Sequence, residues 1–502
     1  MCDPGRPAGC VRVAAERLIV VALSAVLAIG ANACGSKGPR RDGPRVEVVQ
    51  TNHDLSQRLS QLPDVHFVAQ TPRALPIITV DDTVRYQRFA GLGAAMTDSS
   101  AWLLETQLSA PARTAVMSSL FGTARLGLRF VRVPMAASDF TALGRPYSYD
   151  DVSRGHSDRT LARFSVAHDD AYVIPALQKV EAVDHAVKFL AEPWSPPAWM
   201  KTNDAFDNFA GAGRLRSDAY APLAQYFVRF IRDYGARGIQ IGAITPQNEP
   251  GHPTRYPGLD LSVTDEARFI AAYLAPALRR AGLHPRIYAF DANWLYGDQP
   301  LRFVRNRAAS QVAGIAWHCY AGNAGRMAVL HGIVPRMDEI VSECSTGIAP
   351  GPTAALLVAA FRNWASAVIL WNLALNLQGG PVQPPNSGCD RCTAVVTVDQ
   401  RRHTASYTAD YFALGQLSRF VRPGAQRIES PNFVSYNTTL LTRGPNYATP
   451  GLDDVAFENP DGSKVVLAYN NASRAIRFAV SWRGKAFIYS LPAGATVTFT
   501  WP

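Results

Sequence analysis

Two glutamates, Glu249 and Glu343, end apolar stretches of the chain and have the chemistry of a catalytic pair. Glu249 closes "IGAITPQNE" and precedes Pro250, and Glu343 closes "EIVSE". Two carboxyl groups roughly 5–5.5 Å apart can cleave a glycosidic bond with retention, one as nucleophile and the other as acid and then base. A single glutamate at such a position usually only caps a loop or forms an ion pair. Two of them, among Trp, Tyr, His and Asn residues, favour catalysis on a sugar.

The acid of such a pair must carry a proton at the working pH. Partial burial and the nearby second carboxylate both raise the pKa of a carboxyl group, so the pair itself provides the means. Pro250 should restrict Glu249 to extended backbone and thereby help to aim its carboxyl group.

Side chains suited to sugar recognition stand at the ends of the neighbouring apolar stretches. Aromatic rings can stack on the apolar face of a pyranose, and charged or amide groups can bind its hydroxyls. The aromatic candidates are Trp194, Trp199, Tyr320 and Trp371, the hydroxyl-binding candidates are Arg132, Asp139 and Asn248, and Asp291, Asn293, His318 and Asn372 also end strands. Each aromatic alone is more often a core residue, but Trp194 and Trp199 stand in the Pro-rich loop "AEPWSPPAWMKTN".

The elements that must position these residues are short apolar strands alternating with amphipathic helical stretches. The predicted strands are Phe89–Ala94, Leu128–Val133, Val187–Ala191, Gln240–Thr245, Arg286–Asp291, Gly314–His318, Glu339–Glu343 and Val368–Asn372. Eight such strand–helix units predict an α/β fold, a (β/α)8 TIM barrel, whose functional residues gather at the C-terminal ends of the strands. A doubly wound open sheet is the competing fold.

The segments on either side of the barrel are rich in β-branched residues. "VEVVQT" and "IITVDD" precede it, and "VVLAYNN", "IRFAVSW", "AFIYSLP" and "TVTFTW" follow it. These runs predict an appended all-β sandwich to which both the N-terminal strands and the C-terminal region contribute. The expected divisions are 46–88 for the N-terminal strands, 89–425 for the catalytic barrel and 426–502 for the C-terminal part of the sandwich.

The amino terminus has the pattern of an export signal. Arginines precede the apolar run "LIVVALSAVLAIG", which is too short to span a bilayer but suits a signal-peptide core. We expect residues 1–33 to be removed and 34–45 to form a polar tether. Cleavage after Ala33 would release a secreted protein, whereas Cys34, followed by Gly35 and Ser36, resembles a lipoprotein acceptor that would tether the protein to a membrane.

Composition excludes several classes of function. The chain has 502 residues, of which 47% are hydrophobic, and a formal charge of +10, but its Lys and Arg residues are scattered, which favours a solvated basic surface over nucleic-acid binding. "GLGAAM" is too poor a match to a dinucleotide fingerprint, and motifs of serine esterases, zincins and NTPases are absent from the sequence. We expect no cofactor, no metal and a monomer.

Four cysteines beyond the amino terminus suggest two pairs. Cys389 and Cys392 form a C-x-x-C motif, which favours a loop disulfide over a zinc half-site because no second ligand pair accompanies it. Cys319 and Cys344 each follow a residue expected to face the barrel mouth, so both should point the other way from neighbouring strands. A disulfide or a packed pair of thiols is expected there.

A set of motifs resembles glycoside hydrolase family 30, the family of glucosylceramidases and β-1,6-glucanases. The motifs are "FAGLGAAMTDSSAWLL", "LRFVRVPMAASDF", "PWSPPAWMKTN", "ITPQNEP", "IAWHCYAG", "IVSECS" and "LWNLAL", in order from about residue 80 onward. The resemblance implies a retaining mechanism with Glu249 as acid/base and Glu343 as nucleophile. It also implies a −1 sugar site lined by Arg132, Asp139, Trp194, Asn248, His318, Tyr320 and Trp371.

The sequence departs from the family pattern at Glu192, Ala292 and Gln416, none of them in the catalytic pair. "HCY" beside "ECS" looks most like the β-1,6-glucanase branch, and the expected substrate is a β-glucan or a glycolipid. A β-xylosidase or xylanase of the same family and a non-catalytic carbohydrate-binding protein are the alternatives. The second of these would usually have lost a carboxylate, and both are present.

Overall fold

The computed structural model describes residues 43–69, 74–142, 144–346, 352–383, 389, 391–430, 437–438 and 451–502. The predicted signal segment and Cys34 lie outside these residues. Among the described residues, no helix is both long and apolar enough to cross a bilayer.

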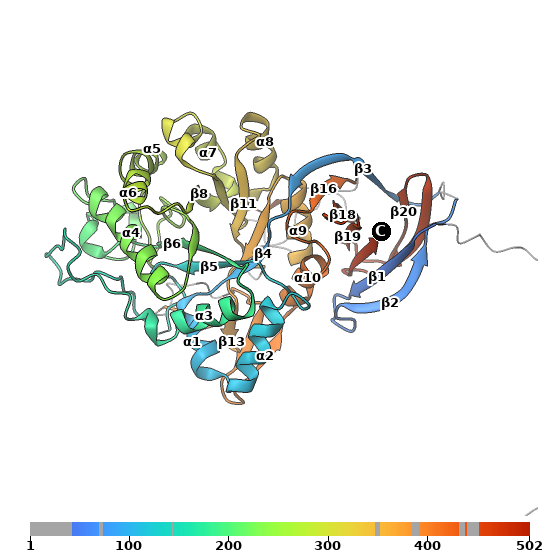
Figure 1. Ribbon diagram of the computed structural model, residues 1–502, viewed down its shortest axis with the longest axis horizontal. Coiled ribbons are helices and arrows are strands. Elements are labelled where there is room, and N and C mark those ends of the chain that lie inside the picture. The colour runs from blue at the N-terminus through green and yellow to red at the C-terminus, as the bar shows by residue number, and fades with distance from the viewer. Residues whose placement is uncertain are drawn as a thin grey trace, which may run out of the picture. The chain divides into compact units, whose positions relative to one another are not determined.

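Eight parallel strands close into a barrel, so the predicted TIM barrel is confirmed and the open sheet is wrong (Figure 1). In chain order the strands are β4 (Gly91–Ala95), β5 (Phe130–Pro134), β6 (Lys188–Glu192), β7 (Ile241–Ile244), β8 (Arg286–Asn293), β9 (Gly314–His318), β11 (Asp338–Glu343) and β12 (Ala367–Leu370). Each overlaps the strand predicted from the sequence. Gly93 shows why β4 carries small residues, because a Cβ there would lie 2.3 Å from the Phe130 carbonyl oxygen on β5.

A layer of apolar side chains fills the barrel below its mouth. Its members come from the barrel strands and are Phe130, Leu190, Ala243, Tyr288, Ala316, Ile340, Ala367 and Ile369. Branched and aromatic residues in such layers make the barrel a packed core and not a pore. The polar side chains at the strand ends therefore have a rigid floor beneath them.

Helices surround the barrel. They are α1 (Asp98–Trp102), α2 (Ala110–Phe121), α3 (Val173–Val183), α4 (Tyr220–Ala236), α5 (Val263–Arg268), α6 (Ala275–Arg280), α7 (Asp298–Phe303), α8 (Gly325–Ile333), α9 (Thr353–Arg362) and α10 (Ala409–Ser418). Helix α9 is buried on all sides because it also packs against the sandwich. In α4 the residues Phe227, Phe230 and Tyr234 are buried at helical spacing. The predicted helix after β7 is α5 and α6, joined by a π-helical turn at Phe269–Leu274.

Beside the barrel, strands from both ends of the chain form a β-sandwich. Its strands run in the order β2 (Ser60–His66), β1 (Arg45–Thr51), β22 (Thr496–Trp501), β19 (Lys464–Asn470), β18 (Leu452–Glu458), β16 (Gln426–Glu429), β3 (Ile77–Arg88), β20 (Ile476–Trp482) and β21 (Lys485–Leu491). The early strands β1 and β2 lie beside the last ones in Figure 1. The predicted contribution of both chain ends is therefore confirmed.

Barrel and sandwich meet through aromatic and polar side chains. Phe89 at the start of the barrel contacts Phe361 of α9 and Phe457 of β18, with ring centroids 5.2 and 5.7 Å away. Gln416 of α10 donates to Thr51 of β1 at 2.8 Å and accepts from Thr498 of β22 at 2.6 Å. The departure from the family pattern at Gln416 thus belongs to this interface and not to the barrel mouth.

Among the described residues, two smaller sheets form in the loops. Strands β13 (Ala374–Asn376), β14 (Val396–Asp399) and β15 (Thr404–Tyr407) form a three-stranded sheet after β12, and β10 (Gly322–Asn323) pairs with β17 (Asn437–Thr438). Leu375 of β13 packs in one apolar cluster with Trp194 and Trp371, so this sheet lies beside the aromatic residues of the mouth.

Candidate active site

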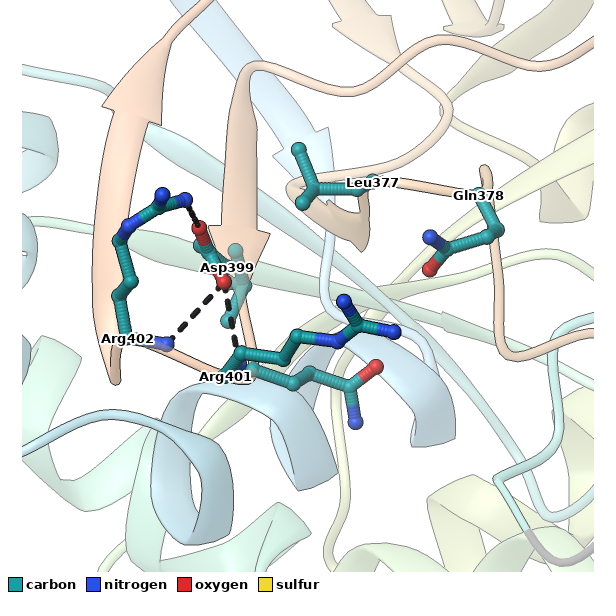
Figure 2. A pocket seen from close by; sticks show the side chains of 7 residues that line it. Leu377, Gln378, Asp399, Arg401 and Arg402 are labelled. Carbon is teal, nitrogen blue, oxygen red and sulfur yellow. Dashed lines mark hydrogen bonds and ion pairs between the residues drawn. The ribbon is translucent and has the colours of Figure 1, made fainter.

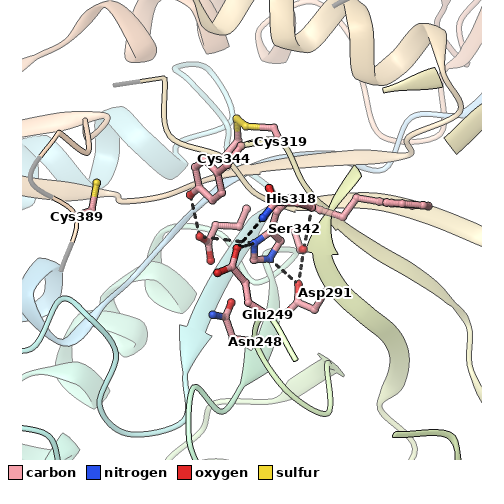
Figure 3. Close-up of polar contacts among 12 residues, drawn as sticks. Asn248, Glu249, Asp291, His318, Cys319, Ser342, Cys344 and Cys389 are labelled. Carbon is pink, nitrogen blue, oxygen red and sulfur yellow. Dashed lines mark hydrogen bonds and ion pairs between the residues drawn. A yellow bond between two sulfur atoms is a disulfide. The ribbon is translucent and has the colours of Figure 1, made fainter. Parts of the chain in front are cut away.

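The ends of five barrel strands bring their polar side chains to one buried cluster at the barrel mouth (Figure 3). Arg132 comes from β5, Asp291 from β8, His318 from β9 and Glu343 from β11, while Glu249 follows β7. Each of these strands delivers a side chain because its apolar part is held in the barrel while its last residues are free to be polar.

Glu343 is held by a cation and a hydroxyl. Its Oε2 forms an ion pair with Nη1 of Arg132, and its Oε1 accepts a hydrogen bond from the Tyr320 hydroxyl at 2.8 Å. Burial raises the pKa of Tyr320 well above its usual value, with the charge of Glu343 acting in the same direction, so the hydroxyl keeps its proton and remains a donor. Glu343 is therefore fixed in orientation beside a cation and a hydrogen-bond donor.

Glu249 is held by an imidazole and an amide. Its Oε1 lies 3.1 Å from Nδ1 of His318 and accepts from Nδ2 of Asn293 at 3.1 Å. Burial alone would raise the pKa of Glu249, but the hydrogen bond and charge of His318 outweigh it, and the pKa lies below its usual value.

The backbone of Glu249 differs from the sequence prediction. Its φ is +41°, in the left-handed region, and not the extended geometry expected before Pro250. Two hydrogen bonds hold this turn: the Glu249 N–H donates to the Asp291 carbonyl at 3.0 Å, and the His252 N–H donates to the Glu249 carbonyl at 3.0 Å. The proline disfavours one region of backbone space, but these bonds to neighbouring residues select the conformation that is adopted.

His318 and Asp291 connect the two glutamates. Nε2 of His318 lies 3.1 Å from Oδ1 of Asp291, and Nδ1 faces Glu249 at 3.1 Å and Glu343 at 3.8 Å. Burial would lower the pKa of His318, but the surrounding carboxylates raise it to about 10. His318 is therefore a buried cation at neutral pH.

Contact with one common atom limits the distance between the catalytic candidates. Because the Oε1 atoms of Glu249 and Glu343 lie 3.1 and 3.8 Å from Nδ1 of His318, they lie within about 7 Å of each other. Retaining glycosidases have carboxyl groups roughly 5–5.5 Å apart, whereas inverting enzymes need roughly 6.5–9.5 Å to admit a water. The limit admits the spacing of retaining enzymes and excludes most of the inverting range.

Arg132 is fully buried and faces carboxylates on several sides. Nη2 donates to Asp291 at 3.0 Å and to Oδ1 of Asn248 at 2.8 Å, and Nε lies 3.4 Å from Glu192. Burial raises the pKa of Glu192 well above its usual value, and neither of its oxygens has a hydrogen-bond partner in the described structure. Glu192 is thus a buried carboxyl group beside the guanidinium of Arg132, where burial raises its pKa and the charge of Arg132 lowers it.

Asp139 and a group of aromatic rings complete the site. Burial and then the charges of Glu343 and Glu249 raise the pKa of Asp139 well above its usual value. The indoles of Trp194 and Trp371 stack with centroids 5.1 Å apart, and Tyr256 lies 5.3 Å from Trp194. The indole N–H of neither tryptophan is bonded in the described structure, which leaves donors for an incoming hydroxyl.

Not every aromatic candidate belongs to this wall. Trp199 donates its indole N–H to Asp150 at 3.0 Å and packs in the main barrel core, so its expected role in stacking on the sugar is wrong. Its side chain is buried because the Pro-rich loop folds back onto the barrel. Trp194, five residues earlier, instead faces the mouth.

Two disulfides lie close to the mouth. Cys319 and Cys344 are bonded to each other behind β9 and β11, and Cys389 is bonded to Cys392 beside the aromatic wall of Trp194 and Trp371. Figure 3 shows the first bridge on the side of the strands that faces away from His318. It ties together the two strands that carry His318 and Glu343. Among the described residues, no group of His, Cys, Asp and Glu is arranged to hold a metal.

A hollow of about 490 Å³ lies on the loop sheet after β12 (Figure 2). Leu377, Gln378, Asp399, Arg401 and Arg402 line it, with Asp399 and Arg402 paired at 2.7 Å. It contains neither of the catalytic candidates and is separate from the buried cluster.

Sequence reasoning gave no role to several residues of the cluster. Asp291 accepts hydrogen bonds from Thr245 at 2.7 Å and from Ser342 at 2.5 Å, in addition to Arg132 and His318. Its position at a strand end was visible, but its function as the partner of both cations was not. No pattern in the sequence points to Tyr256 as a site residue. It lies in the irregular loop after β7, nine residues beyond Gln247.

Most of the chain resembles known glycosidases. Residues 89–421 match the glycosyl hydrolase family 30 TIM-barrel domain, and residues 424–499 match the family 30 β-sandwich domain. An endo-1,6-β-D-glucanase of Neurospora crassa is 33% identical over 430 residues, covering 83% of this chain and 88% of that protein. The lysosomal acid glucosylceramidase of Mus musculus is 28% identical over 455 residues, covering 85% and 83%.

Solved structures agree with these sequence relatives. The endo-β1,6-glucanase BT3312 superposes with a TM-score of 0.78 at 27% identity, covering 91% of this chain and 99% of that one. SrfJ from Salmonella typhimurium has a TM-score of 0.81 at 25% identity over the same shares. The expected family is thus confirmed by both of its domains, and the chain belongs to glycosyl hydrolase family 30.

Proposed function

We propose that this glycoside hydrolase cleaves internal bonds of β-1,6-glucan and retains the anomeric configuration. We propose that Glu343 is its nucleophile and Glu249 its acid/base. The observation that carries the catalytic assignment is the convergence of both carboxylates on Nδ1 of His318. The substrate assignment is supported by the similarity to endo-1,6-β-glucanases, both in sequence and among solved structures.

In the first step, an oxygen of Glu343 attacks the anomeric carbon while Glu249 protonates the departing glycosidic oxygen. The C1–oxygen bond to the leaving sugar breaks and an ester bond to Glu343 forms. Arg132 and Tyr320 hold Glu343 in place for this attack. The stacked Trp194 and Trp371 offer an apolar wall, and Asn248, held by Arg132, is available to a sugar hydroxyl.

In the second step, Glu249 works as a base. The ester removes the negative charge of Glu343, and His318, whose Nδ1 lies 3.1 Å from Oε1 of Glu249, stabilises the Glu249 carboxylate that this step needs. A water gives its proton to Glu249 and its oxygen to C1, and the bond to Glu343 breaks. For the first step Glu249 must bind a proton, although His318 holds the pKa of Glu249 below its usual value before a sugar binds. In that protonated state, Arg132 and His318 face the carboxylates of Asp291 and Glu343.

The test is a hydrolysis panel with the product anomer followed by NMR. We expect linear β-1,6-glucan to be cleaved to oligosaccharides with the β-anomer formed first, and with kcat/KM well above those for glucosylceramide and β-xylan. An α-anomer as first product would contradict the roles of the two glutamates. Preferential hydrolysis of glucosylceramide or xylan would contradict the substrate, and no hydrolysis of any β-glycoside would support a binding protein.

We propose in addition that the protein is exported and acts as a monomer on glucan outside the cytoplasm. The amino-terminal sequence supports export, either as a secreted protein or tethered through a lipidated Cys34. Labelling with a radioactive fatty acid, compared between wild type and Cys34→Ser, separates the two forms.

A further inference from the structure

The loop that follows Glu249 must border the leaving group. In the proposed reaction Glu249 protonates the departing oxygen, so the sugar that leaves lies on the side of Glu249 and not on the side of Glu343. His252, whose N–H donates to the Glu249 carbonyl, begins the part of this loop that extends outward.

A second loop, after β6, is fastened to this one. The buried ammonium of Lys201 donates to the carbonyls of Phe206 and Asp207 on its own loop and of Gly258 on the other, at 2.6, 2.7 and 2.6 Å. Asn208 donates from Nδ2 to the His252 carbonyl at 3.0 Å. The residue after Asn208 is therefore held beside the loop of the proton donor.

That residue, Phe209, exposes an aromatic ring to solvent. Its side chain is 51% exposed, and the guanidinium of Arg255 lies 4.0 Å from its ring centroid. Arg255 is itself exposed, and among the described residues it forms no ion pair. The next residue, Tyr256, turns inward to Trp194. Residues 255 and 256 thus connect the buried sugar site with an exposed aromatic surface.

We propose that Phe209 and Arg255 form a plus-numbered subsite, on the leaving-group side of the cleaved bond, that binds a glucosyl unit of the leaving part of a β-1,6-glucan chain. This assignment rests on the proposed function. Arg255 covers one face of the ring, and the exposed part can stack on the C–H face of a pyranose. The guanidinium has free donors for the hydroxyls of the same sugar.

The mixed character of this surface argues for a sugar and against a lipid chain. A ceramide tail has no groups that would use the donors of Arg255, and covering an exposed guanidinium with alkyl chains costs desolvation. A glucosyl unit has both an apolar face and hydroxyls at its rim, so it can satisfy the ring and the guanidinium together.

The test compares Phe209→Ala and Arg255→Ala on two substrates. β-Glucosyl fluoride has a leaving group of one atom, which cannot reach the subsite, whereas a β-1,6-linked glucotetraose fills it. We expect kcat/KM for the tetraose to fall about tenfold in Phe209→Ala and less in Arg255→Ala, with the fluoride within about twofold of wild type. Val329→Ala removes a side chain of similar exposure on α8 and should change neither rate.

Transfer to an acceptor provides an independent measurement. With β-glucosyl fluoride as donor, the hydroxyl of an added β-1,6-glucobiose attacks C1 of the glycosyl-enzyme, gives its proton to Glu249 and releases Glu343. The ratio of transfer to hydrolysis should fall in Phe209→Ala, because the acceptor must occupy the same subsite. Glucan cleavage and transfer both unchanged in this variant would overturn the subsite while leaving the proposed function intact. A wild type that hydrolyses the fluoride but no β-1,6-glucan would overturn both.

Discussion

The polar cluster at the mouth of the barrel and the interior of the sandwich are both largely buried, but they bury opposite kinds of side chain. Arg132, Glu192, Asp291 and His318 are all 0% exposed at the mouth. The sandwich core is formed by rings and aliphatic groups such as Phe67, Phe487, Phe499 and Val480. Buried charges cost desolvation energy that their pairing only partly returns, whereas buried rings stabilise the fold directly. The charges at the mouth therefore serve the reaction, and the rings of the sandwich core serve the stability of the fold.

Removal of Glu343 should have the largest effect on activity. In Glu343→Gly we expect kcat on β-1,6-glucan to fall by roughly 10⁴-fold or more, because no glycosyl-enzyme can form. Azide fits the vacated space, so it should restore turnover of an activated aryl β-glucoside and give the α-glycosyl azide. Turnover near wild type without azide would mean that Glu343 is not the nucleophile.

Glu249→Ala should separate the two catalytic roles at the mouth. Loss of general acid catalysis should lower kcat/KM on β-1,6-glucan by about 10²–10⁴-fold. A 2,4-dinitrophenyl β-glucoside needs no protonation of its leaving group, so formation of its glycosyl-enzyme should be nearly unaffected. This is measured as the amplitude of the dinitrophenol burst. An equal loss on both substrates would contradict the acid role.

Phe499→Ala tests whether the core of the sandwich stabilises the fold. Phe499 is fully buried and its ring lies 5.0 Å from Phe487 and 5.1 Å from Tyr489. Its truncation should lower the free energy of unfolding by about 3–5 kcal/mol, with kcat/KM of the folded protein little changed. Denaturant unfolding followed by tryptophan fluorescence measures the loss. The matched control is Phe209→Ala, which removes an exposed ring and should leave the unfolding free energy unchanged.

The charge of His318 should make the mouth a source of pH-dependent stability. Its pKa is about 10 in the folded protein and about 6.5 in an unfolded chain, so the folded state binds the extra proton between these values. The stabilising contribution is complete below pH 6.5 and is lost as the pH rises through 10, with a slope of at most about 1.4 kcal/mol per pH unit. Unfolding curves between pH 6.5 and 10 should show this slope in wild type. A His318→Asn variant with the same slope would show that another group is responsible.

The sequence predicted the barrel well because each strand has its own apolar run bounded by polar residues. Gly314–His318 was predicted with its final bounds, and the strand ends pointed to Glu249, His318 and Glu343. Strand order and closure then follow from general rules for parallel sheets, so residues far apart in the sequence could be assigned to one mouth.

Local rules failed where long-range contacts decide the outcome. The backbone of Glu249 was predicted from Pro250 alone, but hydrogen bonds to Asp291 and His252 determine it. Trp199 was assigned to the sugar by its loop composition, yet the loop folds back onto the barrel. The role of Asp291 depends on two cations from other strands, which no periodicity in its own segment reveals.

The pairing of β1 with β22 has a consequence for biosynthesis. Strand β22 lies between β1 and β19, so the sheet stays divided until β22 has been synthesised. A chain that lacks β22 therefore has two unpaired strand edges, and loss of only Thr496–Trp501 would leave both of them open. Late truncation should thus produce aggregation during synthesis and not a shortened active enzyme.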